Sequence, residues 1–282
     1  MIHCSKAGGV LPRRPIITLI TDFGTADHYV GTMKGVILNI NPEVQIVDIC
    51  HHVSPYDIFE AAYALVQSYR YFPSGTIHLV VVDPGVGTAR RPILARAGQH
   101  RFVAPDNGVL SLLFTREESV KVWHVTADHY FLNPVSNTFH GRDIFAPIAG
   151  WLSKGVEVEK FGDPITDYTQ FSSPKPKRVS ENLVKGMTLK VDSFGNLITN
   201  ISPEDVPELF SENPPPFKII VNHQEITRLN LAYSMGRPSE LFAMVGSSGF
   251  IEICVNRGSA AKILNANRGV DVGVVIGGAL PA

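Results

Sequence analysis

Hydrophobic and polar positions change rhythm once along this chain, and the change divides it into two predicted parts. In the first part, short apolar runs alternate with longer segments whose apolar residues recur at helical spacing. Apolar runs lie at 16–22, 44–49, 76–83 and 120–125, helical segments at 27–40, 54–72 and 141–155, and a hairpin at 91–97 and 100–107. Ser54 is the expected N-cap of the second helix, with Pro55 at its first position. Strands buried on both faces and alternating with helices predict an α/β fold, a mainly parallel sheet flanked by helices.

The second part begins after a polar stretch that is rich in proline and serine, "DPITDYTQFSSPKPKRVSEN" at 163–182, and this stretch is typical of a linker. Beyond it, short β-branched runs are broken by Gly, Asn and Pro, and no long helical pattern interrupts them. This pattern predicts a small all-β barrel. The expected organisation is an N-terminal extension at 1–14, an α/β domain at 15–165, a linker at 166–182 and a β-barrel domain at 183–282.

Composition narrows the class of protein. The 282 residues are 44% hydrophobic and carry a net charge of -1, which is ordinary for a soluble protein and unlike a nucleic-acid binder. No apolar run reaches the ~18 residues of a membrane span, and the first residues lack the apolar core of a signal peptide. The three cysteines, Cys4, Cys50 and Cys254, are far apart and favour free thiols in a reducing compartment. We therefore expect a cytoplasmic protein that binds neither nucleic acid nor membrane.

Polar residues gather where the predicted strands end, and in an open α/β sheet those ends meet at the edge where ligands bind. The first strand is followed by Asp22 and Asp27, the second by His51, His52, Ser54 and Tyr56, the third by Asp83 and Arg90, and a later one by Asp106 and Asn107; His140, Arg142 and Asp143 open the last helix. One acid at a strand end is usually a turn former or helix cap. Acids or histidines at four strand ends predict a binding or catalytic site.

The absence of common nucleotide-binding motifs limits the kinds of ligand that this edge could bind. The chain has no GxxxxGK[ST] segment, and no GxGxxG follows the first strand. The carboxylate of Asp22 can accept two hydrogen bonds from a ribose diol, and no lysine or arginine follows it directly to hold phosphates. An adenosine-like ligand without a phosphate chain is therefore predicted.

Several longer segments together resemble one known family. They are "TDFGTADHYVGTMKGVI", "VVDPGVGTARR", "APDNG", "HGRDIFAP", "DSFGNLITNI" and "GSSGFIEICVNRGSA", in this order between Thr21 and Ala260. They resemble the S-adenosyl-L-methionine (SAM) hydroxide adenosyltransferases, also called SAM hydrolases, which are sequence relatives of the fluorinating and chlorinating SAM enzymes. The resemblance implies an N-terminal α/β domain, a C-terminal β-barrel, and homotrimers whose SAM site lies between one subunit's N-domain and a neighbour's C-domain. It also implies SAM as substrate rather than cofactor, adenosine and L-methionine as products, and no metal.

The resemblance also implies roles for individual residues. The family's water-activating Asp-Arg-His set falls on Asp83, Arg90 and His140. For the substrate, the implied contacts are Asp22 with the ribose hydroxyls, Asp27 with the methionine end, Asp192 and Ser247 with the methionine ammonium and carboxylate, Asn196 and Asn256 with the adenine edge, Tyr233 with the adenine face and Tyr56 with the ribose side. The halogenating relatives carry an aromatic residue at the position of Asp83 and lack the arginine. Where the fluorinating enzyme has Asn-Ser-Arg, this chain reads "GSS" at 246–248, so no arginine is offered to the methionine carboxylate.

The chemistry of SAM explains why these residue types would be needed. Attack at the ribose C5' releases methionine as a neutral thioether, so no general acid is required. Water is a weak nucleophile at pH 7. An adjacent arginine favours its ionised form, and an acid or a histidine can accept its proton.

Other readings of the same residues remain open at this point. Asp83 and Arg90 could form a structural ion pair, and His140 could be a packing residue. We expect His51 and His52 to serve the fold or an interface, Arg142 and Asp143 to stabilise a helix start, and Asp106 and Asn107 to form turns. The rival functions are a non-catalytic SAM or adenosine binder, a SAM-dependent halogenase, and a metal-dependent phosphoesterase, although the chain lacks an HxH or HxxxH pair.

Overall fold

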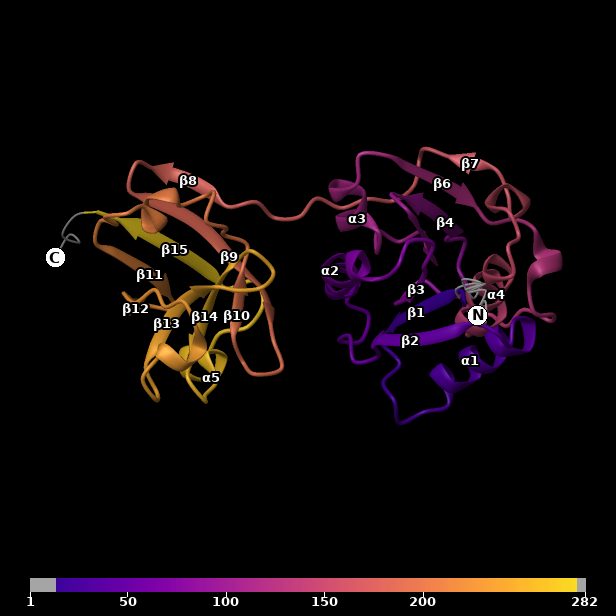
Figure 1. Cartoon of the computed structure of the whole chain (residues 1–282), viewed down its shortest axis with the longest axis horizontal. Helices are drawn as coiled ribbons and strands as arrows, with labels where there is room; N and C mark the ends of the chain where they lie inside the picture. The colour runs from indigo at the N-terminus through magenta and orange to yellow at the C-terminus, as the bar shows by residue number, and fades with distance from the viewer. Residues whose placement is uncertain (1–13, 278–282) are drawn as a thin grey trace, which may run out of the picture. The chain divides into compact units, whose positions relative to one another are not determined.

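The computed structural model describes residues 14–277, and the chain divides into two compact units after Ser172 (Figure 1). We call them the N-terminal and the C-terminal unit. The expected extension, apart from Arg14, lies outside the described residues, as do Cys4 and the last five residues of the expected barrel domain.

The N-terminal unit is built on one mixed sheet. Its strand order is β2 (Gln45–Cys50), β1 (Ile16–Thr21), β3 (Ile77–Val81), β5 (His100–Pro105), β4 (Pro92–Ala97), β6 (Val120–His124) and β7 (Pro164–Ile165). The first four strands of that order are parallel, while β4, β6 and β7 join by antiparallel pairing. The predicted α/β class is confirmed, and the predicted hairpin supplies the step from parallel to antiparallel pairing.

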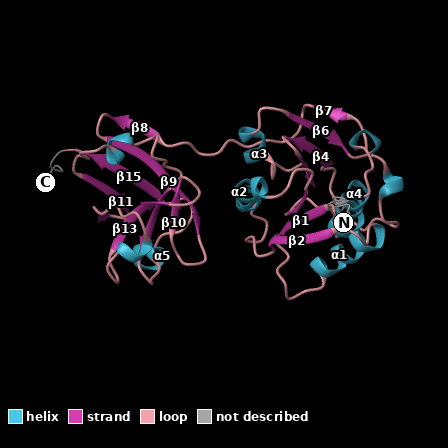
Figure 2. Cartoon of the chain, viewed as in Figure 1, coloured by secondary structure: helices cyan, strands magenta, loops and turns pink. Residues whose placement is uncertain are grey.

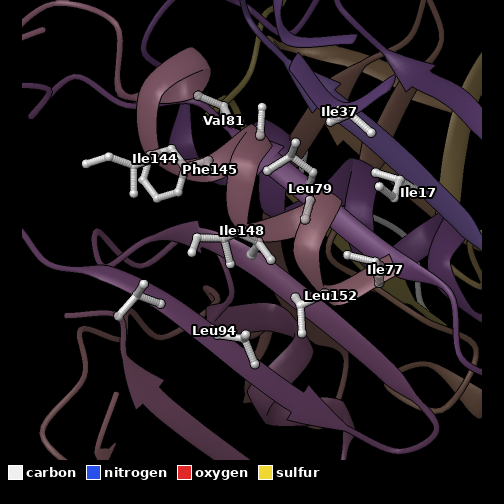
Figure 3. Close-up of a cluster of buried hydrophobic side chains, with 14 of the residues drawn as sticks. Ile17, Ile37, Ile77, Leu79, Val81, Leu94, Ile144, Phe145, Ile148 and Leu152 are labelled. Carbon is white, nitrogen blue, oxygen red and sulfur yellow. The ribbon is translucent and has the colours of Figure 1, made fainter. Parts of the chain in front are cut away.

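Helices cover both faces of this sheet, as strands buried on both sides require. The helices are α1 (Tyr29–Ile40), α2 (Ile58–Ser68), α3 (Ser111–Arg116) and α4 (Ala146–Ser153), with short 3-10 turns at Tyr69–Tyr71, Asp128–Tyr130 and Val158–Lys160. Leu79 of β3 packs with α1 and α4 in one hydrophobic cluster, whereas the next residue, Val80, packs with α2 and α3 in another. Figure 3 shows the first cluster, in which Ile148 and Leu152 of α4 lie against Leu79.

One predicted helix start is wrong, and one helix begins with a different kind of turn from a regular α-helix. Helix α2 begins at Ile58, not at Ser54, because the side chain of Asp57 caps it by accepting a hydrogen bond of 2.9 Å from the backbone N–H of Glu60. Ser54 instead donates its backbone N–H to the Glu60 side chain. The last helix opens with a π turn at Gly141–Phe145, and regular α-helix begins only at Ala146.

The C-terminal unit is an antiparallel, nearly closed barrel, which confirms the predicted class (Figure 2). Its strand order is β12 (Gln224–Ile226), β11 (Phe217–Val221), β15 (Asp271–Ile276), β9 (Leu183–Val191), β10 (Leu197–Thr199), β14 (Ile251–Val255) and β13 (Leu241–Val245), with β8 (Lys177–Ser180) beside β9. The segment after β12 nearly closes the circle, because the backbones of Arg228 and Asn230 each form a hydrogen bond of 2.8 Å with Ala243 of β13. One short helix, α5 (Ala260–Leu264), and 3-10 turns at Pro207–Phe210 and Tyr233–Met235 complete the unit.

A buried histidine on β3 predicts how the N-terminal unit responds to acid. His78 is fully buried, its Nδ1 lies 2.7 Å from Thr18 Oγ1, and its ring stacks on Phe102. Burial, and secondarily the charge of nearby His100, lowers the pKa of His78 from 6.5 to about 3. Below about pH 6.5, His78 therefore binds a proton in the unfolded chain but stays neutral in the folded chain. Acid for this reason favours unfolding.

We expect this one histidine to lower the free energy of unfolding by about 2 kcal/mol between pH 7 and pH 5. Urea unfolding at the two pH values measures this loss. His78→Phe is expected to make the acid-induced loss smaller, whether or not the substitution changes the stability at pH 7. His52→Gln, at an exposed position, is the control. An equal acid-induced loss in His78→Phe and in the unmodified chain would exclude His78 as the source.

Candidate active site

The carboxyl ends of β1, β2, β3 and β5 lie at one edge of the sheet because these strands are parallel. Side chains tie the segments that follow these strands to one another. Thr21 Oγ1 lies 2.9 Å from His51 Nδ1, and Asn107 donates from Nδ2 to the carbonyl of Val82 at 2.9 Å. The edge predicted from the sequence therefore exists, and its loops are connected to one another.

A tight loop joins Asp83 to Arg90 at this edge. The loop is closed by hydrogen bonds from Val86 N to the carbonyl of Asp83 and from Thr88 Oγ1 to the carbonyl of Gly85. Gly87 has φ +77, and a Cβ there would lie 2.2 Å from the carbonyl oxygen of Asn137, so the loop can dock in this way only with glycine.

The loop returns the guanidinium of Arg90 to the carboxylate of Asp83. Arg90 Nε donates to both carboxylate oxygens at 2.9 and 3.0 Å, and Nη2 donates to Oδ2. The side chains of Arg90 and Asp83 are only 8% and 5% exposed. This is a buried ion pair with fork geometry, which holds both groups more tightly than an exposed pair would.

His140 is the third member of the cluster. Its Nδ1 lies 2.7 Å from Arg90 Nη2, and because a guanidinium can only donate, Nδ1 accepts. Burial, followed by the positive charge of Arg90, lowers the pKa of His140, while Asp83 and Asp143 oppose the shift. The ring is therefore neutral near pH 7 and carries its proton on Nε2. In this geometry His140 orients Arg90 and has no free lone pair for a proton from water.

One donor of this cluster has no partner within the described residues. Arg90 uses Nε and Nη2, and its planar face lies 4.9 Å from the ring centre of Phe145, yet Nη1 is buried and makes no hydrogen bond to residues 14–277. A buried donor left unpaired costs about 1–3 kcal/mol. Such an atom is suited to binding the oxygen of a small ligand, and it would favour the anionic form of that ligand.

The structure brings two other predicted residues of this unit together. The backbone N–H of Tyr56 donates to Asp22 Oδ2 at 2.9 Å, and Tyr56, which is 71% exposed as a residue, adopts φ 67. Asp22 thus keeps acceptor capacity beside an exposed aromatic ring. Asp27 is exposed, and the structure does not bring it into contact with the other predicted residues.

In the C-terminal unit, Asp192 and Asn196 lie together at the turn between β9 and β10. Asp192 Oδ1 accepts from the backbone N–H groups of Phe194 and Asn196, and Oδ2 accepts from Asn196 Nδ2 at 2.9 Å. The Asn196 side chain is thereby fixed and keeps its amide oxygen for another partner.

The remaining predicted residues lie around β13 and β14. Asn256 Nδ2 donates to the carbonyl of Gly236 at 2.8 Å, at the end of the 3-10 turn that carries Tyr233. Tyr233 donates its hydroxyl to Glu252 at 3.0 Å. Ser247 is exposed in the turn between the two strands, and the structure does not bring it into contact with the other predicted residues.

Sequence reasoning did not single out Glu252 or Asn137. Glu252 had a sequence signal, because "IEICV" places one acid inside an otherwise apolar strand, and such an acid is rarely buried without a partner. Asn137 had no signal, since its role depends on a contact with Gly87 that only the folded chain creates. Asp106, expected as a turn former, also accepts from Arg91, and Asp143 accepts from the backbone of Ser136.

Comparison with known proteins identifies the family of both units. Residues 17–162 match the SAM hydroxide adenosyltransferase N-terminal domain, and residues 186–273 match the C-terminal domain of the same family. The chain therefore belongs to the SAM hydroxide adenosyltransferase family.

Relatives over nearly the whole chain include hydrolases and a halogenating enzyme. The (R)-S-adenosyl-L-methionine hydrolase of Salinispora tropica is 35% identical over 93% of this chain and 98% of its own length. The hydrolase of the same name from Methanocaldococcus jannaschii is 32% identical over 89% and 92%. A fluorinase of Nocardia brasiliensis is 28% identical over 94% and 98%. A crystal structure of an uncharacterised conserved protein from Thermotoga maritima superimposes with a TM-score of 0.85 at 36% identity, covering 92% of this chain and 99% of that one.

Within residues 14–277, no three His, Cys, Asp or Glu side chains are grouped so that they could hold a metal ion. In the same part of the chain, every helix is too short or too polar to cross a membrane.

Proposed function

We propose that this protein hydrolyses SAM to adenosine and L-methionine by in-line attack of hydroxide on the ribose C5'. The observation that carries the proposal is the buried Arg90 Nη1, which has no partner in the part of the chain that the structure describes, while Asp83 and His140 hold the other nitrogens of the guanidinium. The hydrolase relatives, at 32 to 35% identity over nearly the full chain, support the choice of substrate.

The proposed step balances without a cofactor. Water bound at Arg90 Nη1 ionises, because the guanidinium charge favours hydroxide over water. The proton passes to Asp83, whose carboxylate has lone pairs beyond those that Arg90 occupies. The new C5'–O bond forms as the C5'–S bond breaks, and the sulfonium leaves as the neutral thioether of methionine. His140 acts through Arg90, holding the guanidinium in place.

The substrate contacts are also part of the proposal. Asp22 would accept from the ribose diol with Tyr56 against the sugar, and Asp27 would face the methionine end. The contacts proposed in the C-terminal unit are Asp192 and Ser247 with the methionine ammonium and carboxylate, Asn196 and Asn256 with the adenine edge, and Tyr233 with the adenine face. The fixed Asp192–Asn196 pair and the exposed face of Tyr233 support these roles.

We also propose a cytoplasmic homotrimer whose site is completed by a neighbouring subunit, as the family resemblance implies. The C-terminal unit exposes large apolar side chains that association would cover, at Phe194, Leu231, Met235 and Ile263, which are 77%, 90%, 57% and 50% exposed. The free thiols of Cys50 and Cys254 fit a reducing compartment. Sedimentation equilibrium tests the trimer, and cell fractionation tests the location.

The deciding experiment incubates metal-free protein with SAM and follows adenosine and methionine by chromatography. Equimolar products are expected, and Asp83→Ala and Asp83→Asn are expected to lower turnover about 100-fold or more, because the proton acceptor and the partner of Arg90 are lost. Asp163→Asn, at an exposed position, is the control.

Other outcomes favour the rival functions. SAM binding without adenosine would contradict hydrolysis and favour a non-catalytic binder. A halogenated adenosine formed from added fluoride or chloride would favour the halogenase, and loss of activity with a chelator would favour the metal-dependent enzyme.

A further inference from the structure

Strand β14 carries one charged residue on the outer face of the barrel. Ile251, Ile253 and Val255 point into the barrel core, so the intervening Glu252 and Cys254 point outward. The neighbouring strands place Met244 of β13 and Ile198 of β10 directly opposite Glu252. The carboxyl therefore lies on a largely apolar outer surface, on the side of the barrel that bears the predicted adenine contacts.

Glu252 is nevertheless buried, at 4% exposure, and it has no ion-pair partner within the described residues. Burial raises the pKa of its carboxyl, with a further contribution from the charge of Asp192, while the hydrogen bond from Tyr233 opposes the shift. A buried acid without a cation costs folding free energy. An acid at this largely apolar position, where it does not stabilise the fold through an ion pair, points to a role in ligand binding.

Each oxygen of the carboxyl meets a different part of the proposed substrate surface. Oε2 accepts a hydrogen bond from the hydroxyl of Tyr233, a residue that is 45% exposed. Oε1 lies against the backbone of Gly246, where a Cβ would be only 1.8 Å from it. Gly246 starts the turn that presents Ser247, and the turn is closed by hydrogen bonds from Gly246 N to Phe250 O and from Gly249 N to Gly246 O.

We propose that Glu252 is a positioning residue for both ends of the substrate, because its single carboxyl fixes the Tyr233 ring and supports the Gly246–Gly249 turn. The inference rests on the proposed function and deepens it. Tyr233 faces the nucleoside end and Ser247 the amino-acid end, so one buried group sets the spacing between the two. Asp192, whose negative charge reaches the Glu252 carboxyl, makes this surface anionic, which suits a substrate that carries a sulfonium and an ammonium group.

The test compares Glu252→Ala, Glu252→Gln and Tyr233→Phe in SAM turnover, with adenosine and L-methionine as product inhibitors. Glu252→Ala is expected to raise KM about ten-fold with kcat changed less than about three-fold, and to weaken inhibition by both products, because Tyr233 loses its hydrogen bond and Gly246 loses the carboxyl that packs against it. Tyr233→Phe keeps the ring and is expected to weaken inhibition by adenosine alone. Glu252→Gln retains an acceptor for the tyrosine and is expected to lie between the unmodified enzyme and Glu252→Ala.

A double-mutant cycle separates positioning from a general loss of structure. If Glu252 acts partly through Tyr233, the effects of Tyr233→Phe and Glu252→Ala on adenosine inhibition are less than additive. Glu204→Gln, at an exposed position of the same unit, is the matched control. Should Glu252→Ala fail to fold, Glu252→Gln and Tyr233→Phe carry the test.

Two results would overturn the inference: KM and both inhibition constants of Glu252→Ala equal to those of Glu204→Gln, or full additivity in the cycle. Failure of the proposed function looks different, because the unmodified protein would then release no adenosine. In that case, calorimetric titration of adenosine and L-methionine into the same variants applies the same criteria without turnover.

Discussion

Replacing Arg90 by lysine is expected to lower the turnover of SAM by about 100- to 1,000-fold, although the charge is kept. A lysine can pair with Asp83, but one ammonium cannot also reach His140 and leave a donor at the position of Nη1. The nucleophile then loses the group that favours its ionised form. Turnover in the variant is therefore expected to increase with pH, because hydroxide must come from solution. Initial rates of adenosine release from pH 6 to 10 measure both effects.

Arg91 provides a matched control for this experiment. It follows Arg90 directly and pairs with Asp106 at 2.7 Å and with Asp167 at 2.9 Å, away from the free donor of Arg90. Arg91→Lys is expected to keep turnover within about three-fold, since its pairs brace loops rather than bind the nucleophile. If Arg90→Lys retained turnover to within ten-fold of the unmodified enzyme, charge alone would suffice and the role given to Nη1 would be wrong.

Replacing Asp143 by alanine is expected to lower the free energy of unfolding by about 3 kcal/mol, the largest stability effect that we expect. The side chain is fully buried, accepts the backbone N–H of Ser136 at 2.8 Å and pairs with Arg142, whose Nη2 lies 2.9 Å from it. Alanine leaves the Ser136 donor and the guanidinium without this partner. Urea unfolding at pH 7 measures the loss, and Asp143→Asn is expected to lose less because it keeps an acceptor.

An exposed pair of the same kind gives the comparison for Asp143. Asp167 pairs with Arg91, but its side chain is 76% exposed, so Asp167→Ala is expected to lower the stability far less than Asp143→Ala. Equal losses in Asp143→Ala and Asp167→Ala would show that burial does not set the value of the Asp143 pair. Asp143 also holds Ser136, next to the Asn137 on which the Gly87 loop docks, so a smaller decrease in turnover should accompany the loss of stability.

Two features of the structure, the start of α2 and the contacts of Glu252, could not be predicted from the sequence, and each has a physical cause. The start of α2 was misplaced because Ser54, Pro55 and Asp57 all carry helix-start signals, and local pattern cannot choose between them. The structure chooses Asp57 because the preceding residues form a loop that brings the backbone of Tyr56 to Asp22, a contact between residues far apart in sequence. Glu252 was overlooked because its neighbours Tyr233 and Gly246 come close only when the barrel forms.

The sequence by itself determined the two fold classes and the edge at which polar residues gather, because hydrophobic periodicity is local and parallel strands must end at the same edge. Its motifs also determined the family. Only the tertiary structure decided which donor and acceptor atoms of those residues form hydrogen bonds within the protein. His140 accepts from Arg90, Arg90 Nη1 has no partner among residues 14–277, and Glu252 meets both Tyr233 and Gly246. All three features depend on contacts between distant segments, which local patterns do not encode.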